Sequence, residues 1–138
     1  MFSFSTDYYL MVAVAAFGVI QIAASIGGLR GLLLFKSPAV TRVLGAALIL
    51  AALYWFFSSA PRNINDYEGG LDGNRQAVYF LLGAITATAL TVLVSSARNS
   101  RLGKGVAIAQ EGLDALRHAN YLRALKRTME QRRKHGAA

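Results

Sequence analysis

The sequence has no cysteine, two histidines and only seven acidic residues among its 138. Without cysteine the chain has no disulfide framework, no thiolate nucleophile and no cysteine metal site. His118 and His135 lie 17 residues apart and have no companion ligands, so we expect both to be solvated. The G-x-S-x-G and H-E-x-x-H motifs, a phosphate-binding loop and a dinucleotide fingerprint are all missing. No nucleophile–base or acid–base pair converges, and we therefore expect neither an enzyme nor a cofactor.

What the sequence has instead is long runs without charge. Hydrophobic residues make up 54% and charged residues 16% of the chain. The run 77–97 carries no charge and is long enough to cross a hydrocarbon core of about 30 Å at about 1.5 Å per helical residue. Comparable apolar runs occupy 8–29, which is uncharged, and 41–59, in which Arg42 near the start is the one charged residue. We predict an all-α fold, an integral membrane three-helix bundle with an amphipathic basic helical extension. Its parts are a transmembrane domain at 1–97, with a loop at 60–76, and a tail at 98–138.

The charges are distributed asymmetrically around these runs. The net charge is +8, and cations follow the first run at Arg30, Lys36 and Arg42. The tail has ten Lys or Arg against three acidic residues, whereas the loop 60–76 is slightly acidic. Cations favour the cytoplasmic side, and aromatic residues at the loop-side ends of all three runs favour one common interface. We expect a multi-pass cell-membrane protein with its N-terminus outside and its tail in the cytoplasm.

Small and hydroxyl-bearing residues recur along the first and third runs, where they let helix backbones approach closely in lipid. Gln21 is the one strongly polar side chain of the first run and could hydrogen-bond across to a threonine. These faces either pack the three helices together or dock another membrane subunit. The candidate helix-packing residues are Gln21, Ala23, Gly27, Gly31, Ala84, Thr88, Thr91 and Ser95.

The loop between the second and third runs contains Asp66, Glu68 and Asp72, and Asn74 is the expected N-cap of the third helix. Carboxylate oxygens are ligands for hard cations such as Ca²⁺, but this spacing does not match the EF-hand pattern. Three interpretations are open: a structured turn with solvated carboxylates, which we favour, a partner-docking loop, or a metal site.

Apolar residues of the tail recur at three- and four-residue spacing, which predicts amphipathic helix. One stripe begins at Leu102 and ends at Leu116, and a second follows a break near 118–120, so we expect a hairpin or a kinked helix. The candidate lipid- or partner-binding residues are Leu113, Leu116, Arg117, Leu122, Arg123, Leu125, Lys126, Arg127, Met129, Arg132, Arg133 and Lys134. Anionic inner-leaflet lipid and a cytoplasmic protein are both expected partners. Nucleic acid is disfavoured because Tyr121 is the only aromatic residue of the tail.

The pattern as a whole indicates a non-catalytic accessory, anchoring or scaffold subunit whose tail docks a cytoplasmic partner or anionic lipid. Two alternatives remain beside it. One is a homo-oligomeric transporter or channel component lined by the hydroxyl groups of the spans, although no ionisable side chain lies in the middle of any run. The other is a membrane sensor that uses the acidic outer loop.

Overall fold

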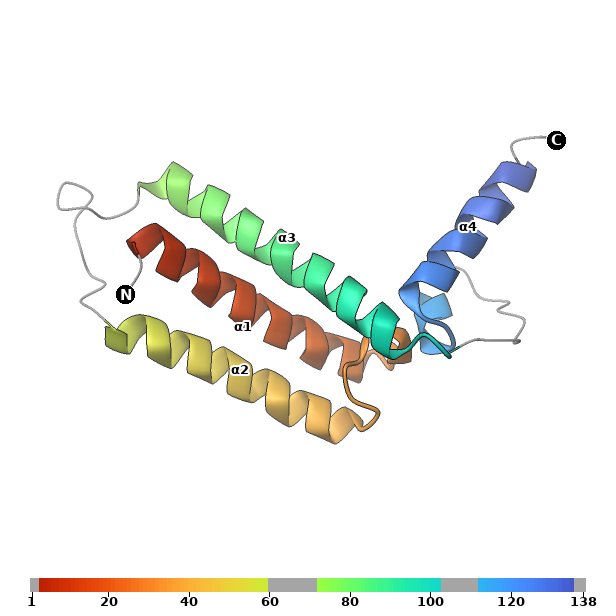
Figure 1. Cartoon of the computed structure of the whole chain (residues 1–138), viewed down its shortest axis with the longest axis horizontal. Coiled ribbons are helices and arrows are strands. Elements are labelled where there is room, and N and C mark those ends of the chain that lie inside the picture. The colour runs from red at the N-terminus through yellow and green to blue at the C-terminus, as the bar shows by residue number, and fades with distance from the viewer. Residues whose placement is uncertain (1–2, 60–71, 103–111, 136–138) are drawn as a thin grey trace.

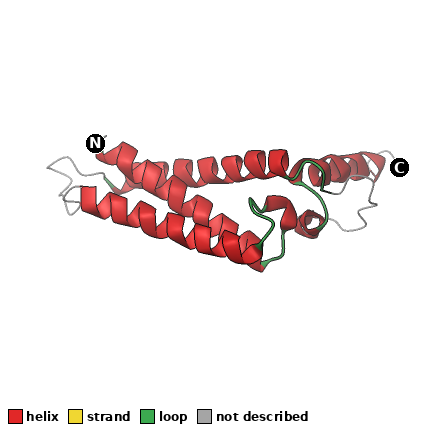
Figure 2. Ribbon diagram, turned by 60° about the horizontal axis from the view of Figure 1, so that its bottom comes forward, coloured by secondary structure: helices red, strands yellow, loops and turns green. Residues whose placement is uncertain are grey.

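The computed structural model describes residues 3–59, 72–102 and 112–135, without the side chains of 131, 132, 134 and 135. Its described part is all-helical, as the sequence predicted, and Figure 2 draws the described residues as helices and loops. The elements in chain order are α1 (Phe4–Ile26), the 3-10 helix η1 (Arg30–Leu32), α2 (Pro38–Ser59), α3 (Gly73–Arg98), the 3-10 helix η3 (Gly112–Arg117) and α4 (Tyr121–His135).

The three long helices α1, α2 and α3 are each long and apolar enough to cross a membrane. They contain 23, 22 and 26 residues, and about 20 helical residues are needed to span the hydrocarbon core. Each begins three or four residues before its predicted apolar run, because hydrogen-bonding side chains cap the helix ahead of the apolar segment. The chain is therefore a small multi-pass integral membrane protein.

The beginnings of α2 and α3 illustrate how far capping can be predicted. The Ser37 hydroxyl accepts from the Val40 amide at 3.4 Å, in the expected N-cap position of α2. For α3, the expected cap Asn74 is wrong: the cap is Asp72, whose carboxylate accepts from the Arg75 amide at 2.8 Å. Both residue types make good caps, and the ionised one lies nearer the favourable positive end of the helix dipole.

Helix α1 lies between α2 and α3 and packs against both of them (Figure 1). Among the described residues, α2 and α3 make no comparable contact with each other. The three helices consequently form a layer with α1 in the centre. We call the end of this layer that holds Phe4, Ser59 and Gly73 the loop end, and the opposite end the tail end.

Glycines set the two closest approaches within the layer. A Cβ added to Gly18 would lie 2.6 Å from the Gly45 carbonyl oxygen, and one added to Gly45 would lie 2.8 Å from the Gly18 carbonyl oxygen. On the other side of α1, a Cβ added to Gly83 would lie 2.8 Å from a methyl carbon of Val12. Small residues at such crossings bring backbones close enough to gain dispersion energy in lipid.

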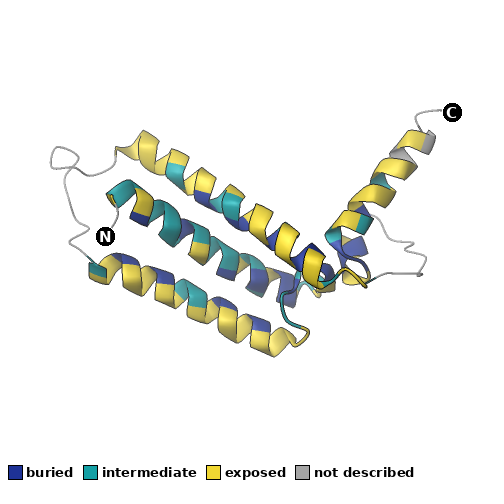
Figure 3. Cartoon of the chain, in the orientation of Figure 1, coloured by how far each residue is buried: buried dark blue, intermediate teal, exposed yellow. Residues whose placement is uncertain are grey.

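The burial pattern of the layer is the reverse of that of a water-soluble protein. Large apolar side chains are exposed on the outer faces of α2 and α3, as at Leu50 (68% exposed) and Leu93 (63%), and Figure 3 shows these faces. Polar side chains such as Thr41 and Thr91 are buried between helices instead. Exposed apolar area on this scale is stable in hydrocarbon and costly in water, which agrees with three membrane spans.

Aromatic rings gather at the loop end. Phe56 of α2 makes edge contacts with Phe4 and Tyr8 of α1 and with its neighbour Phe57, at centroid distances of 5.8, 6.1 and 5.2 Å. Asp7, in the first turn of α1, is fully buried at the same end. The aromatic residues that the sequence assigned to one interface thus meet in space across two helices.

Candidate functional site

The connector, residues 27–37, joins α1 to α2 at the tail end and folds back against α1. The Gln21 amide nitrogen donates to the Leu32 carbonyl at 3.2 Å, and its oxygen accepts from the Leu34 amide at 3.1 Å. Gln21 is only 2% exposed. The sequence allowed a hydrogen bond from Gln21 to a threonine of another helix, but its side-chain amide bonds the connector instead. Backbone groups of a non-helical segment have no helical partner, and Gln21 satisfies two of them within the apolar layer.

Asn99 holds the same connector from the other side. It is the C-cap residue of α3, and its side-chain amide donates to the Leu33 carbonyl at 2.8 Å. The carbonyls of Arg30 and Gly31 lie at 3.4 Å from the same nitrogen. No sequence pattern singled out Asn99. A polar amide immediately after a predicted span was the available signal, since exposed carbonyls cluster where helices end.

Helix α2 is fastened to the tail end of α1 through Ser25. The Ser25 hydroxyl donates to the Pro38 carbonyl at 3.1 Å and accepts from the Arg42 guanidinium at 3.0 Å. On the α3 side, the Arg98 guanidinium lies 5.3 Å from the centroid of the Phe35 ring, within cation–π range. All three spans are thereby tied to the connector, which becomes the common structural element of the tail end.

The tail docks directly on this connector. Gly31 is buried, and a Cβ added there would overlap the Ala119 carbonyl oxygen and lie 3.0 Å from the Leu116 carbonyl oxygen. Around this contact lies a small apolar group that we call the junction cluster. It consists of buried Ala115, Leu116 and Ala124, with Leu29, Leu32 and Tyr121 packed against it.

Two polar contacts complete the junction. The Arg123 guanidinium donates to the Leu102 carbonyl at 2.7 Å, which ties α4 to the chain just beyond α3. The Asn120 side chain accepts from the Arg123 amide at 3.0 Å and caps α4. A break near 118–120 is therefore present, as predicted. Before the break, the described part of the first predicted stripe is the short 3-10 helix η3, and residues 103–111 lie outside the described part.

In the first half of α3 the buried face lies one residue away from the predicted packing face, and in the second half the two faces agree. Thr91 and Ser95 are buried, and the buried stripe continues through Ala87 and Gly83 at four-residue spacing. Ala84 is only partly buried and Thr88 is exposed, so neither is central to the α1–α3 contact. The Thr88 hydroxyl instead donates to the Ala84 carbonyl at 2.9 Å. The glycine at 83 decides the face, since it alone permits the close approach to Val12.

The predicted packing face of α1 differs more. Ala23 is exposed, Gly27 is the half-buried C-cap residue of α1, and Gly31 lies beyond the helix in η1. The helix ends before Gly31, so the four-residue spacing of these three positions does not place them on one helical face. Of the predicted set for the first run, Gln21 and Gly31 lie at the tail end and contact the connector and the tail respectively. The residues that α1 buries are Asp7, Val12, Gly18, Gln21, Ala24 and Ser25.

The tail residues divide between the junction and the surface. Leu116 and Arg123 take part in the junction, whereas Leu113 is exposed and Arg117 lies 3.1 Å from Asp114 in an exposed ion pair. The exposed residues of α4 include Leu122, Leu125, Lys126, Arg127, Met129 and Arg133. The side chains of Arg132 and Lys134 lie outside the described part.

The acidic loop is represented by Asp72 alone, because Asp66 and Glu68 lie outside the described residues. Asp72 is exposed, caps α3, and lies 3.6 Å from the Arg75 guanidinium. Over residues 3–59, 72–102 and 112–135, no three His, Cys, Asp or Glu side chains gather as a metal site would require. The candidate cation site of the loop stays a prediction.

An apolar groove of about 540 Å³ runs between α1 and α3 on one side of the layer. Its lining includes Ala15 and Val19 of α1 together with Ala84 and Thr88 of α3. Ala84 and Thr88 therefore border an open, mainly apolar surface. Such a surface accommodates a lipid chain or a further transmembrane helix.

The tail end thus has a fixed connector, a docked tail and an amphipathic α4, and the described residues there form contacts suited to holding and presenting a segment of chain. Comparison of the chain with protein-family models, with curated proteins and with solved structures finds no match.

Proposed function

We propose that this protein is a non-catalytic membrane anchor or scaffold subunit that fixes a basic amphipathic tail at the cytoplasmic surface of the cell membrane. The observation that carries the proposal is the docking of the tail on the connector through Gly31, the junction cluster and Arg123. A basic extension that served only to orient the chain during insertion would need charge and no such packing.

The contacts of the connector support a holding role. Gln21 and Ser25 of α1 and Asn99 at the end of α3 fasten the tail end. These polar groups lie within or next to segments that are otherwise apolar. Hydrogen bonds inside a membrane-embedded layer contribute about 1 kcal/mol each. A connector that is held by these hydrogen bonds keeps the docked tail, and with it α4, in one orientation.

The distribution of cations supports a cytoplasmic tail end. Exposed Arg30, Lys36, Arg42, Arg98 and Arg101 all lie at or near that end. The loop end has the aromatic contacts of Phe56. Basic residues in short segments next to spans are retained in the cytoplasm, and aromatic residues favour either interface. The N-terminus is accordingly proposed to face outward.

The channel alternative receives less support from the side chains of the spans. Gln21 bonds the connector, Thr91 donates to the Ala87 carbonyl, and Thr86 shares a hydrogen bond of 2.8 Å with Tyr9. These groups are engaged within the layer, and among the described span residues they do not form a continuous polar surface. A liposome flux assay on the purified protein separates the two functions, since a scaffold subunit gives no flux.

The scaffold proposal is tested by photo-crosslinking in native membranes together with purification in mild detergent. A photo-reactive amino acid at Lys126, which is exposed on α4, is expected to give one recurring protein adduct, and the same protein should co-purify with the unmodified chain. The matched control is Ala87, which is fully buried and should label only its own chain. Repeated recovery of the chain alone, with no adduct from Lys126, would contradict the scaffold function.

A further inference from the structure

Helix α4 carries an apolar stripe that the rest of the described chain leaves uncovered. Leu122, Leu125 and Met129 are 56%, 38% and 59% exposed, and their three- and four-residue spacing places them on one side of the helix. The face that packs on the junction contains Ala124 and Tyr121 and adjoins the stripe, because Tyr121 lies four residues before Leu125. The stripe therefore extends beyond the junction contact along α4 and stays exposed there.

The remaining surface of α4 is strongly cationic. The helix contains six Lys or Arg and one Glu, and an ion pair joins Lys126 and Glu130 at 4.0 Å on the exposed surface. Such a pair contributes little in water. A helix with an apolar stripe and a basic polar face has the pattern of segments that lie in the plane of a membrane interface.

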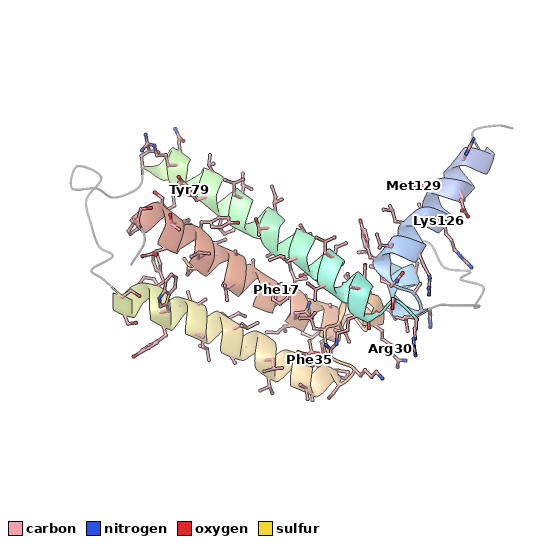
Figure 4. All side chains as sticks on the ribbon, in the orientation of Figure 1. Phe17, Arg30, Phe35, Tyr79, Lys126 and Met129 are labelled. Atoms are coloured by element: carbon pink, nitrogen blue, oxygen red, sulfur yellow. The ribbon has the colours of Figure 1, made fainter. Side chains whose placement is uncertain are left out.

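The position of α4 matches this pattern. The helix leaves the tail end crosswise to the long axis of the layer (Figure 1), and its first turn is pinned there by the Arg123–Leu102 contact. In Figure 4 the Met129 and Lys126 side chains leave neighbouring sides of α4, with Met129 nearer to the side that faces the three spans. The stripe thus faces the membrane interface, where the hydrocarbon around the spans would end.

We propose that α4 lies in the headgroup layer of an anionic membrane leaflet, with Leu122, Leu125 and Met129 turned into the lipid and its cations among the phosphates. This inference rests on the proposed function, because it identifies what covers the tail that the spans hold in place. Lipid is favoured over a cytoplasmic protein on two grounds. The stripe is held at the end of three apolar membrane-spanning helices, and the exposed cations around the tail end complement anionic headgroups.

The experiment uses the full-length chain, in which the absence of native cysteine makes single-site labelling clean. Met129→Cys, Lys126→Cys and a span reference, Leu93→Cys, are each labelled with an environment-sensitive fluorophore. The purified proteins are reconstituted in vesicles of zwitterionic lipid alone or of zwitterionic and anionic lipid mixed. Emission wavelength and quenching by bromine-labelled acyl chains report lipid contact, and quenching by iodide reports contact with water.

In anionic vesicles, Met129→Cys is expected to emit at a shorter wavelength than Lys126→Cys and to be quenched by the brominated lipid, as Leu93→Cys is. Replacing Lys126 by Gln in the Met129→Cys background should lower the ratio of docked to undocked α4 about fivefold, from the typical contribution of one basic residue near an anionic surface. Lipid contact should weaken in zwitterionic vesicles and at high salt, since both remove the attraction to headgroups.

Equal access of iodide to both positions in anionic vesicles would overturn the inference. So would lipid contact at Met129 that is the same in both lipid compositions, or protection of Met129 that arises only when a cytoplasmic extract is added. These vesicles contain no other protein, so failure here leaves the scaffold function to be judged by its own crosslinking and co-purification. Conversely, loss of the co-purifying partner leaves the lipid contact of α4 intact.

Discussion

Substitution of Gly31 by Ala is the most direct perturbation of the junction between the spans and the tail. The added Cβ would overlap the Ala119 carbonyl oxygen and crowd that of Leu116. Both are backbone atoms, so no side-chain rotation relieves the contact. Gly31 has no left-handed backbone conformation, and the effect is therefore steric and not conformational.

The size of the effect follows from what the junction buries. Leu116 is 2% exposed, and full burial of such a side chain contributes about 1.5–3 kcal/mol. The Arg123–Leu102 hydrogen bond adds roughly 1 kcal/mol. Overpacking at Gly31 costs about 1–3 kcal/mol. This cost is comparable with the combined contribution of Leu116 burial and the Arg123–Leu102 hydrogen bond. Gly31→Ala is therefore expected to raise the undocked fraction of the tail by about tenfold or more, since each 1.4 kcal/mol is a factor of ten.

The assay is the rate at which a maleimide modifies a single cysteine at Ala124, which is 7% exposed in the junction cluster. The reaction should be slow in the background protein and accelerate in proportion to undocking when Gly31→Ala is added. The control is Gly27→Ala, also at the tail end, where the nearest atom to an added Cβ lies at 3.4 Å, an ordinary contact. An unchanged rate in Gly31→Ala would refute the docking of the tail on the connector.

Three further outcomes are expected. Gln21→Ala should destabilise the protein by about 1–3 kcal/mol because two connector backbone groups lose their partner, and faster amide exchange in the connector would verify it. Gly18→Ala should cost about 1–3 kcal/mol through the clash with the Gly45 carbonyl, measured as a lower unfolding midpoint in detergent; an unchanged midpoint would exclude the close crossing. Asp72→Ala should cost about 0.5–2 kcal/mol as a lost N-cap, whereas Asn74→Ala should cost less in the same measurement.

Local signals predicted much of the secondary structure. The Ser37 cap, the break before Asn120 and the stripe of α4 each depend on a few neighbouring residues, and the structure has all three. Local reasoning was less successful where two signals competed. Asp72 and Asn74 are both plausible caps, and the choice between them depends on where the helix can begin relative to the preceding chain.

The candidate site was less predictable, because its parts come from distant stretches of sequence. Gly31 contacts Ala119, and Asn99 bonds Leu33. No periodicity in either stretch reveals such pairs. The predicted face of α3 was also displaced by one position at Ala84 and Thr88, since small residues occur on several sides of that helix and only the approach to α1 selects among them.

Hydropathy and charge along the chain were enough to predict that three segments form helices in hydrocarbon and that the tail is helical and basic. That conclusion depends on sums over about 20 residues, which no single contact can reverse. Tertiary structure alone decided that α1 is central, that Gln21 and Asn99 hold the connector, and that the tail docks on Gly31. The physical reason is that lipid provides no hydrophobic force to pair helices, so the pairing is left to close packing and a few hydrogen bonds between distant residues.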